Sequence, residues 1–347
     1  MSDSYDAILV VSFGGPEGMD EVMPFLENVL RGKNVPPERM RAVSHHYGMF
    51  GGVSPINEQN RKLIAALQGE LNANGPHLPI YWGNRNWHPM LADTLRQMAA
   101  DGITRALAFV TSAYSSYSGC RQYREDIARA QAEVGSGAPQ IDKLRVFYNH
   151  PGFIEPNIEN VTAALEQIPA DRRAAAHIAF TAHSIPQSMA MNCLYQDQLL
   201  DACGLIAAAL GKEQWQLVFQ SRSGPPTQSW LEPDICDHLR QLKANGAQDV
   251  VIAPVGFISD HMEVIYDLDT EARDLSAEIN LNIVRAATVG THPTFIKMIR
   301  ELIVERMSDA PVRRALGTRG ANHDVCPADC CLMGAARPVG VPTQSSQ

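Results

Sequence analysis

Three carboxylates recur at four-residue intervals in FISDHMEVIYDLDTEA, residues 257–272. Residues four apart lie on one face of an α-helix, so Glu263, Asp267 and Glu271 would form an acidic row. The helix dipole favours an acidic residue in the first turn, which accounts for Glu263 but less well for the other two. Mutual repulsion in such a row raises carboxyl pKa values and suits proton transfer or metal binding. A solvated helix face is the alternative, because exposed like-charge pairs cost only a few tenths of a kcal/mol.

A histidine at a predicted strand tip is the second candidate for chemistry. His183 follows the apolar run HIAFTA, so its ring is expected at the end of a β-strand. A histidine packed in a loop is the alternative. The helix that opens with Ser259-Asp260-His261 begins at another strand tip of the same predicted sheet, which can bring Glu263 opposite His183. An imidazole beside a carboxylate can serve as a general base or as an N/O site for a divalent first-row metal.

Cysteines provide the third candidate. Three of the seven, Cys326, Cys330 and Cys331, lie within six residues in the motif CPADCC. The N-terminal segment has no basic leader and only a short apolar run, so we expect a cytoplasmic protein with reduced thiols. Clustered thiols then indicate metal rather than disulfides. The tail around them is rich in Gly, Pro and Ser, which is typical of disordered segments.

Strand tips and helices must position these residues, and the sequence predicts two lobes that supply them. Short apolar runs alternate with amphipathic segments, which is the pattern of parallel sheets with crossover helices. Ligands bind at the carboxyl ends of such strands. The predicted strands lie near residues 7–12, 78–82, 106–111, 144–148, 177–181, 216–219, 250–254 and 282–286. The predicted helices lie near residues 19–30, 58–72, 90–100, 120–134, 154–167, 195–210, 233–244, 260–275 and 293–307.

Composition limits the class of protein and its partners. With 347 residues and 45% hydrophobic content, the chain can form two lobes with packed cores. A net charge of -9 without basic blocks argues against nucleic acid as a partner. No apolar run approaches the roughly 20 residues that span a bilayer, so no transmembrane segment is expected. The turn FGGPEG lacks the G-x-G-x-x-G pattern of dinucleotide sites.

Six segments together resemble the ferrochelatase family, from Asp6 to about residue 307. They are VVSFGGPEG, HHYGMFGGVSPIN, TSAYSSYSGCRQY, FTAHSIP, QSRSGPPTQSWLEPD and PVGFISDHMEVIYDLDTEA. The resemblance implies an α/β fold in which two Rossmann-like lobes, each with a four-stranded parallel sheet, face a porphyrin cleft. It also implies a lyase-type metal chelatase of haem biosynthesis that inserts Fe2+ into a porphyrin and releases two pyrrole protons. The implied parts are an N-terminal lobe (1–149), a C-terminal lobe (150–290), a terminal helix that packs on the first lobe (291–310) and a Cys-containing tail (311–347).

The resemblance also implies roles for individual residues. His183 is the implied proton acceptor and metal ligand, with Glu263 as its acidic partner. Asp267 and Glu271 continue outward as a path for protons or Fe2+. Some relatives carry Tyr where this chain has Phe13, and a phenyl ring cannot ligate iron. The implied porphyrin-binding residues are Phe13, Arg31, Ser54 and Tyr123.

The substrate and the tail follow from a narrower resemblance. FLENVLRGKNVP, GNRNWHP and the tail look closest to actinobacterial members, which are similar to coproporphyrin III ferrochelatases; protoporphyrin IX is the alternative substrate. The tail resembles an extension that binds a [2Fe-2S] cluster, and such a cluster needs four ligands. Cys120 is the expected fourth ligand and Cys193 the second choice, whereas Cys203 and Cys236 are expected to be packing residues.

Other interpretations stay open from the sequence. The tail thiols could form a zinc site or a reactive cluster instead. The whole chain could be a two-lobed metal or haem carrier without chemistry, or a tetrapyrrole chelatase that loads cobalt or nickel. Other haem-pathway enzymes are the protein partners that the resemblance suggests.

Overall fold

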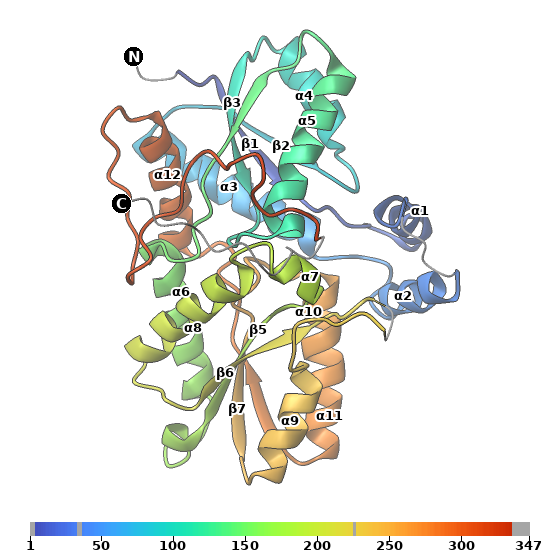
Figure 1. Ribbon diagram of the computed structural model, residues 1–347, viewed down its shortest axis with the longest axis vertical. Helices are drawn as coiled ribbons and strands as arrows, with labels where there is room; N and C mark the ends of the chain where they lie inside the picture. Colours follow the sequence, from blue (N-terminus) through green and yellow to red (C-terminus); the bar gives the residue numbers. More distant parts are fainter. Residues whose placement is uncertain (1–3, 33–36, 225–226, 335–347) are drawn as a thin grey trace, which may run out of the picture.

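Two four-stranded parallel sheets form the centres of two lobes, one above the other in Figure 1. The computed structural model describes residues 4–32, 37–224 and 227–334. The strand order is β2-β1-β3-β4 in the first sheet and β6-β5-β7-β8 in the second, so the predicted fold class is confirmed. The strands are β1 (Ala7–Ser12), β2 (Ile80–Asn84), β3 (Arg105–Val110), β4 (Gln140–Lys143), β5 (His177–His183), β6 (Trp215–Gln220), β7 (Asp249–Ala253) and β8 (Asn282–Arg285).

Helices cover both faces of each sheet, which explains why the inner strands β1, β3, β5 and β7 are largely apolar and buried, unlike the edge strands β4 and β8. In β1, Ile8 packs in the cluster that contains Leu67 of α3, while Leu9 packs in the cluster that contains Leu95 of α4. The helices are α1 (Met19–Val29), α2 (Pro37–Met49), α3 (Ile56–Asn74), α4 (Leu91–Ala100), α5 (Gln122–Val134), α6 (Pro151–Glu166), α7 (Gln187–Ala190), α8 (Tyr195–Ala209), α9 (Ile235–Ala244), α10 (Met262–Tyr266), α11 (Arg273–Glu278) and α12 (Pro293–Met307). Two π-helical segments, Tyr117–Arg121 and Asp267–Ala272, precede α5 and join α10 to α11.

One continuous hydrophobic core joins the two lobes. It runs from Phe109 of the first sheet to Phe180 of the second and includes Phe295 of α12. Helix α12 packs against α3 of the first lobe as well as against α6, so this helix returns to the first lobe (Figure 1). Tyr114, which follows β3, donates a hydrogen bond of 3.0 Å to the backbone oxygen of Val255 in the second lobe. These contacts fix the strand tips of the two sheets relative to each other.

The strand predicted over 144–148 is wrong. The fourth strand is β4, which ends at Lys143, and Leu144 adds one last hydrogen bond to Ala108 before the chain leaves the sheet. The following residues are buried without strand pairing, because Phe147 stacks on Phe109 and Arg145 pairs with Glu305 of α12. An apolar run in the interface between packed elements looks the same in sequence as a buried strand.

Two helices are absent from the sequence prediction. Helix α2 has the polar sequence PERMRAVSHHYGM and buries only Tyr47, so it lacks the apolar stripe by which a surface helix is recognised. Helix α7 has only four residues. The expected boundaries between lobes, terminal helix and tail remain predictions.

The described part of the tail lies against the two lobes despite its Gly-, Pro- and Ser-rich composition. Leu316 donates a backbone hydrogen bond of 2.8 Å to Asn149, and the Asn149 side chain donates to the backbone oxygen of Gly320 at 2.8 Å. The last part of the predicted tail, 335–347, lies outside the described residues. Among the helices of the part that the structure describes, none is long and apolar enough to cross a membrane.

Candidate active site

His183 and Glu263 meet at the strand tips of the second sheet. His183 is the last residue of β5, and Glu263 lies in the first turn of α10, which follows the tip of β7. Their nearest atoms, Nε2 of His183 and Oε2 of Glu263, are 3.5 Å apart. The Nδ1 atom of His183 lies 2.5 Å from the backbone oxygen of Ser184. Because a carbonyl oxygen can only accept, Nδ1 carries a proton and donates it to Ser184, and Nε2 faces Glu263.

The charge of Glu263 controls the protonation of His183. Burial alone would lower the pKa of the imidazole. The Glu263 carboxylate, the hydrogen bonds to Glu263 and Ser184, and the charge of Asp267 together outweigh burial and raise the pKa of His183 to about 9. The sequence suggests a neutral base here, whereas the structure favours imidazolium at neutral pH. A cation that neutralises Glu263 would remove the main support for this proton.

Asp267 is the middle member of the carboxylate row. It accepts hydrogen bonds from the Ser221 hydroxyl and, at 3.2 Å, from Nε2 of Gln220. Burial, followed by the charges of Glu263 and Glu271, raises the pKa of Asp267 to about 7, although the Ser221 hydrogen bond opposes this. The charges of both Glu263 and Glu271 therefore reach Asp267, the middle carboxylate of the row.

Local backbone features hold this row in place. The segment after α10 is π-helical, and such bulges occur often at functional sites. Ser221 has a backbone φ of 61°, which residues other than Gly rarely adopt. Burial and the charge of Asp234 raise the pKa of Glu271, whereas the positive charge of Arg39 lowers it. Helix α2, which carries Arg39, thus comes near the outer end of the row.

Removing the Asp267 carboxyl should change how stability depends on pH. The pKa of about 7 in the folded protein exceeds that of an unfolded Asp, about 4, so the folded state holds an extra proton between these values. Stability therefore falls as pH rises from about 4 to about 7. Asp267→Asn keeps the hydrogen-bond acceptor and removes this dependence, so the variant should gain stability relative to the parent across this window. Urea unfolding at pH 4, 5.5, 7 and 8 measures the free energy of unfolding of both proteins. If this free energy changed with pH in the same way for the variant and the parent, the raised pKa of Asp267 would be contradicted.

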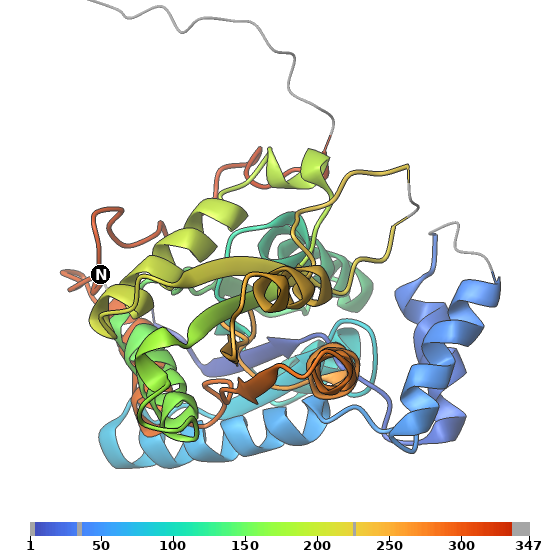
Figure 2. The same cartoon turned by 90° about the horizontal axis from the view of Figure 1, so that it is seen from below.

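Helix α2 of the first lobe lies over the carboxylate row. The ring of His46 stacks on Tyr266 of α10, with centroids 3.8 Å apart and an interplanar angle of 10°. Tyr47 packs with Phe25 of α1 and Met262 of α10, and the Glu263 charge adds to burial in raising its pKa. Figures 1 and 2 show α1 and α2 as a helical pair at the edge of the molecule. The sequence segment HHYGMFGGVSPIN was the available signal for these contacts.

Three of the four expected porphyrin-binding residues surround the turn after β1. The Phe13 side chain is exposed, and its ring lies 6.3 Å from that of Phe25. Ser54 is buried against the same turn. A Cβ atom added to Gly15 would lie only 2.7 Å from the Cβ atom of Ser54, so the two residues are in close contact. Tyr123 is also buried, and the guanidinium carbon of Arg85 lies 4.9 Å from its ring and 5.8 Å from that of Phe13.

The fourth expected porphyrin partner, Arg31, lies elsewhere in the first lobe. It is exposed in the turn that follows α1. No contact places Arg31 with the Phe13 turn in the part of the chain that the structure describes. Its role stays a prediction, as do those of Phe13, Ser54 and Tyr123.

The tail brings its cysteines to the helix that carries Cys120. Cys120 is buried in the π-helical turn before α5, and its thiol interacts with that of Cys326. This interaction and the charge of Lys143 lower the pKa of the Cys326 thiol, whereas the same interaction and burial raise the pKa of Cys120. The sulfur atoms of Cys330 and Cys331 are 3.4 Å apart.

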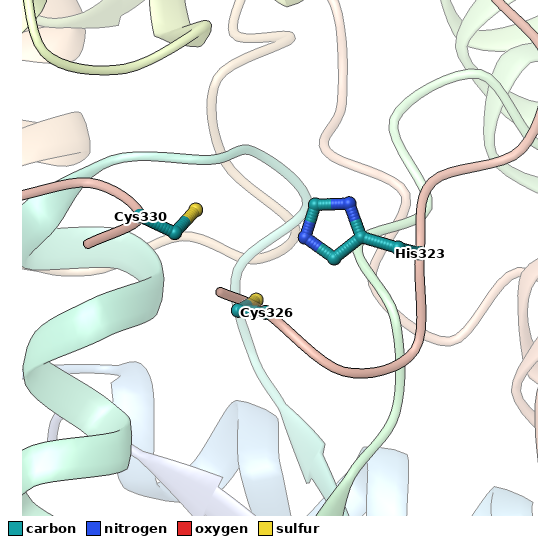
Figure 3. Close-up of side chains that lie close together, drawn as sticks. All are labelled: His323, Cys326 and Cys330. Atoms are coloured by element: carbon teal, nitrogen blue, oxygen red, sulfur yellow. The ribbon is translucent and has the colours of Figure 1, made fainter. Parts of the chain in front are cut away.

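A histidine that the sequence prediction overlooked joins this group. The ligand atoms of His323, Cys326 and Cys330 all lie within 4.8 Å of one another, and Figure 3 shows the three side chains together. The H-x-x-C spacing in HDVC was the available signal. Arg121 anchors the segment, because its Nη1 atom donates to the backbone oxygens of Ala328, at 2.7 Å, and Cys330, at 3.0 Å.

The remaining cysteines have different surroundings. Cys203 is fully buried in α8 and belongs to the main core, as expected for a packing residue. Cys236 is half-buried in α9. Cys193 is half-buried and close enough to Cys331 to influence the pKa of that thiol. The structure therefore brings Cys120 near Cys326 and Cys330 next to Cys331, with Cys193 near Cys331.

The loop that connects β7 to α10 depends on Gly256. Its amide donates to the backbone oxygen of Thr181 at 2.9 Å, and an added Cβ would lie 2.6 Å from the Cα atom of Ala182, next to His183. Gly256→Ala should therefore destabilise the protein by about 1–3 kcal/mol, as overpacking does. Gly69→Ala is the matched control, because this exposed position in α3 has open space and should gain about 0.5–1 kcal/mol. Urea unfolding compares the two; equal stabilities would contradict the close contact.

Comparison with known proteins gives consistent matches along the chain. A family model described as Ferrochelatase matches residues 5–307. A protein named Ferrochelatase from Rhodopirellula baltica is 58% identical over 335 residues, which cover 96% of this chain and 95% of that protein. A Coproporphyrin III ferrochelatase from Streptomyces coelicolor is 52% identical over an alignment of 363 residues, gaps included, which covers 98% of this chain and 97% of that protein.

Solved structures support the fold. The sirohydrochlorin chelatase SirB from Bacillus subtilis subspecies spizizenii, in complex with cobalt, superposes with a TM-score of 0.52 at 13% sequence identity, over 88% of this chain and 96% of that chain. At this identity the likeness concerns the two-lobed architecture alone.

Proposed function

The chain belongs to the ferrochelatase family of metal chelatases, and from this premise we propose that it inserts Fe2+ into coproporphyrin III to give coproheme. The observation that carries the chemistry is the pair of His183 and Glu263, with 3.5 Å between Nε2 and Oε2 at the tips of the second sheet. Coproporphyrin III is favoured over protoporphyrin IX because relatives from Streptomyces coelicolor, Streptomyces griseus and Nocardia farcinica, 50–52% identical, are named for it.

In the proposed reaction, Fe2+ approaches Glu263 and changes the protonation of its neighbour. The carboxylate charge that raises the pKa of His183 to about 9 is then shared with the metal. His183 loses its proton more readily and becomes able to accept one from a pyrrole N–H. Asp267, with a pKa of about 7, can exchange that proton near neutral pH and pass it outward past Glu271.

The first lobe would hold the macrocycle in this proposal. Phe13 offers an exposed aromatic ring, and the guanidinium of Arg85 lies over the rings of Phe13 and Tyr123. Ser54 and Tyr123 are the other expected porphyrin contacts of this lobe. Arg31 would reach a propionate with its fork of N–H donors. Helix α2 would limit access of water, since His46 and Tyr47 contact the α10 helix that carries Glu263.

A metal panel tests the reaction class. With coproporphyrin III under anaerobic conditions, Fe2+ should be inserted at a higher kcat/KM than Co2+ or Ni2+. Preference for cobalt or nickel would favour the other tetrapyrrole chelatases. Binding of porphyrin without insertion of any metal would favour the carrier interpretation.

For the tail, we infer a [2Fe-2S] cluster held by Cys120, Cys326, Cys330 and Cys331. The fit rests on the donor set: four sulfur atoms in two close pairs, with Lys143 and Arg124 as cations beside Cys326. When bound, such a cluster would supply a one-electron redox centre and tie the tail to the first lobe. Arg121 would orient the segment through its two bonds to the tail backbone.

Substitutions separate this cluster from the zinc alternative. Cys120→Ser should abolish charge-transfer absorbance and acid-labile sulfide, whereas Cys203→Ser, in the core of α8, should retain both. A zinc site would instead use His323, Cys326 and Cys330, so His323→Ala would remove stoichiometric zinc. Purified protein with one zinc and no sulfide would contradict the cluster, and a cluster retained in Cys120→Ser would contradict the fourth ligand.

A further inference from the structure

Ser221 has a strained backbone at the tip of β6. It follows Gln220, the last residue of that strand, and its φ of 61° lies in the left-handed region, which is unfavourable for a residue with a side chain. Glycine adopts this region without such a cost. Backbone strain of this kind is common at functional sites. A serine at this position therefore indicates that its hydroxyl has a role that glycine could not fill.

The Ser221 hydroxyl and the Gln220 amide donate to the same oxygen of Asp267. Oγ of Ser221 donates to Oδ2, and Nε2 of Gln220 donates to Oδ2 at 3.2 Å. Within the described ranges of the chain, Oδ1 of Asp267 has no hydrogen-bond partner. The middle carboxylate of the row therefore has one oxygen with two donors and one oxygen with none.

Gln220 also links this carboxylate to both residues of the proposed catalytic pair. Its Nε2 donates to the backbone oxygen of Glu263 at 3.3 Å, and its backbone oxygen accepts from the amide of Ser184, next to His183, at 2.8 Å. The side chain is 1% exposed, and its Oε1 is buried without a partner among the residues that the structure describes. Leaving a buried oxygen unpaired costs free energy. Gln220 keeps this orientation because both of its acceptors need the N–H donors of the amide.

Titratable groups face Asp267 from several elements. They are Glu263 and Tyr266 of α10, Glu271 of the π-helical segment, His183 of β5 and Cys236 of α9. In α11, Arg273 pairs with Asp274 instead. Burial and the two glutamates raise the pKa of Asp267, whereas the Ser221 hydrogen bond and the charge of His183 lower it. The Ser221 hydroxyl thus helps Asp267 to release a proton.

We propose that Ser221 and Gln220 are positioning residues for the proton path, because their donors occupy Oδ2 of Asp267 and leave Oδ1 as the atom that carries the proton. This inference rests on the proposed function, in which protons pass from His183 to Asp267. An O–H bond forms at Oδ1 when a proton arrives and breaks when the proton leaves, while Oδ2 keeps both donors throughout. If the two bonds only anchored the loop after β6, their loss would change stability but not the pH dependence of the reaction.

Ser221→Gly tests the proposal, because it removes the hydroxyl and relieves the strained φ. The variant should remain folded, which urea unfolding checks. The pH at which kcat for Fe2+ insertion is half-maximal should rise by about one unit, because the lost donor favours the protonated carboxyl. From a pKa of about 7, such a shift lowers kcat at pH 7 about fivefold, whereas KM for coproporphyrin III should not change. Gln220→Met, which keeps the length of the side chain without its donors, should also lower kcat at an unchanged KM.

Asn280→Gly is the matched control for Ser221→Gly. Asn280 has a φ of 54° and precedes β8, so it lies at the end of the second sheet opposite the strand tips. Its replacement relieves the same kind of strain and should leave kcat, KM and the pH profile unchanged. A Ser221→Gly variant with the parental kcat and pH profile would overturn the proposal. An equal loss of kcat in the two glycine variants would also overturn it, because the missing hydroxyl would then not be the cause.

A measurement without turnover separates this inference from the proposed function. Infrared difference spectra of the full-length protein, without metal or porphyrin, detect the protonated carboxyl of Asp267, and Asp267→Asn assigns the band by removing it. The midpoint of its titration should lie near pH 7 in the parent and about one unit higher in Ser221→Gly. Equal midpoints in the two proteins would overturn the positioning role, whether or not the protein inserts iron. A shifted midpoint in a protein that inserts no iron would support the positioning of Asp267 and contradict the proposed function alone.

Discussion

Replacing His183 with Ala is expected to lower kcat/KM for Fe2+ insertion by about 10²–10⁴-fold and to change porphyrin affinity much less. The size follows from the loss of a positioned general base, since Nε2 is the ring nitrogen that faces Glu263. Porphyrin affinity should persist because the proposed contacts with the macrocycle come mainly from the first lobe. Anaerobic insertion kinetics, with fluorescence titration of the porphyrin, measure both quantities.

His177→Ala is the matched control for this experiment. His177 is the first residue of the same strand, at the end opposite His183, and is half-buried. Its replacement should leave kcat/KM within about threefold of the parent. If His183→Ala inserted iron at the parental rate, the role assigned to His183 would be wrong. If both variants lost activity equally, the loss would reflect damage to β5 rather than missing chemistry.

The second large effect concerns stability, through the buried ion pair that ties α12 to the segment after β4. Nε and Nη2 of Arg145 donate to the two carboxylate oxygens of Glu305, at 2.6 and 3.0 Å, and both side chains are at most 5% exposed. Glu305→Gln leaves the guanidinium buried without its counter-charge, so it should cost about 3–5 kcal/mol. Urea unfolding at pH 7 measures the change.

Two further variants sharpen this prediction. Glu58→Gln in α3 removes a carboxylate from exposed pairs with Arg61 and Lys62, both at 3.7 Å, and should cost less than about 1 kcal/mol. The double variant Arg145→Met with Glu305→Leu removes both charges and should be more stable than Glu305→Gln alone. If Glu305→Gln alone were as stable as the parent, the prediction for the buried Arg145–Glu305 ion pair would be wrong.

The sequence predicts the site where local patterns determine geometry. The apolar runs that form β5 and β7 place their tips together, because parallel strands end at the same edge of a sheet. His183 ends β5 and Glu263 lies in the helix after β7, so their proximity could be inferred. The spacing of the tail cysteines similarly indicated a metal site, and the structure places Cys326 near Cys120; the cluster itself stays a prediction.

Contacts between distant segments could not be inferred in this way. The run 144–148 is buried by α12 and Phe109 rather than by strand pairing, and hydrophobicity alone does not distinguish these cases. The polar helix α2 is held by the stacking of His46 on Tyr266, a contact between lobes that leaves no periodic signal. The raised pKa of His183 likewise depends on a charge 80 residues away in the chain.

We propose that this member of the ferrochelatase family uses coproporphyrin III as its porphyrin substrate. The most direct measurement is anaerobic Fe2+ insertion into coproporphyrin III and protoporphyrin IX side by side, with the same protein and detergent. We predict turnover of coproporphyrin III with a kcat/KM at least about tenfold above that for protoporphyrin IX. An equal or higher kcat/KM for protoporphyrin IX would contradict the claim.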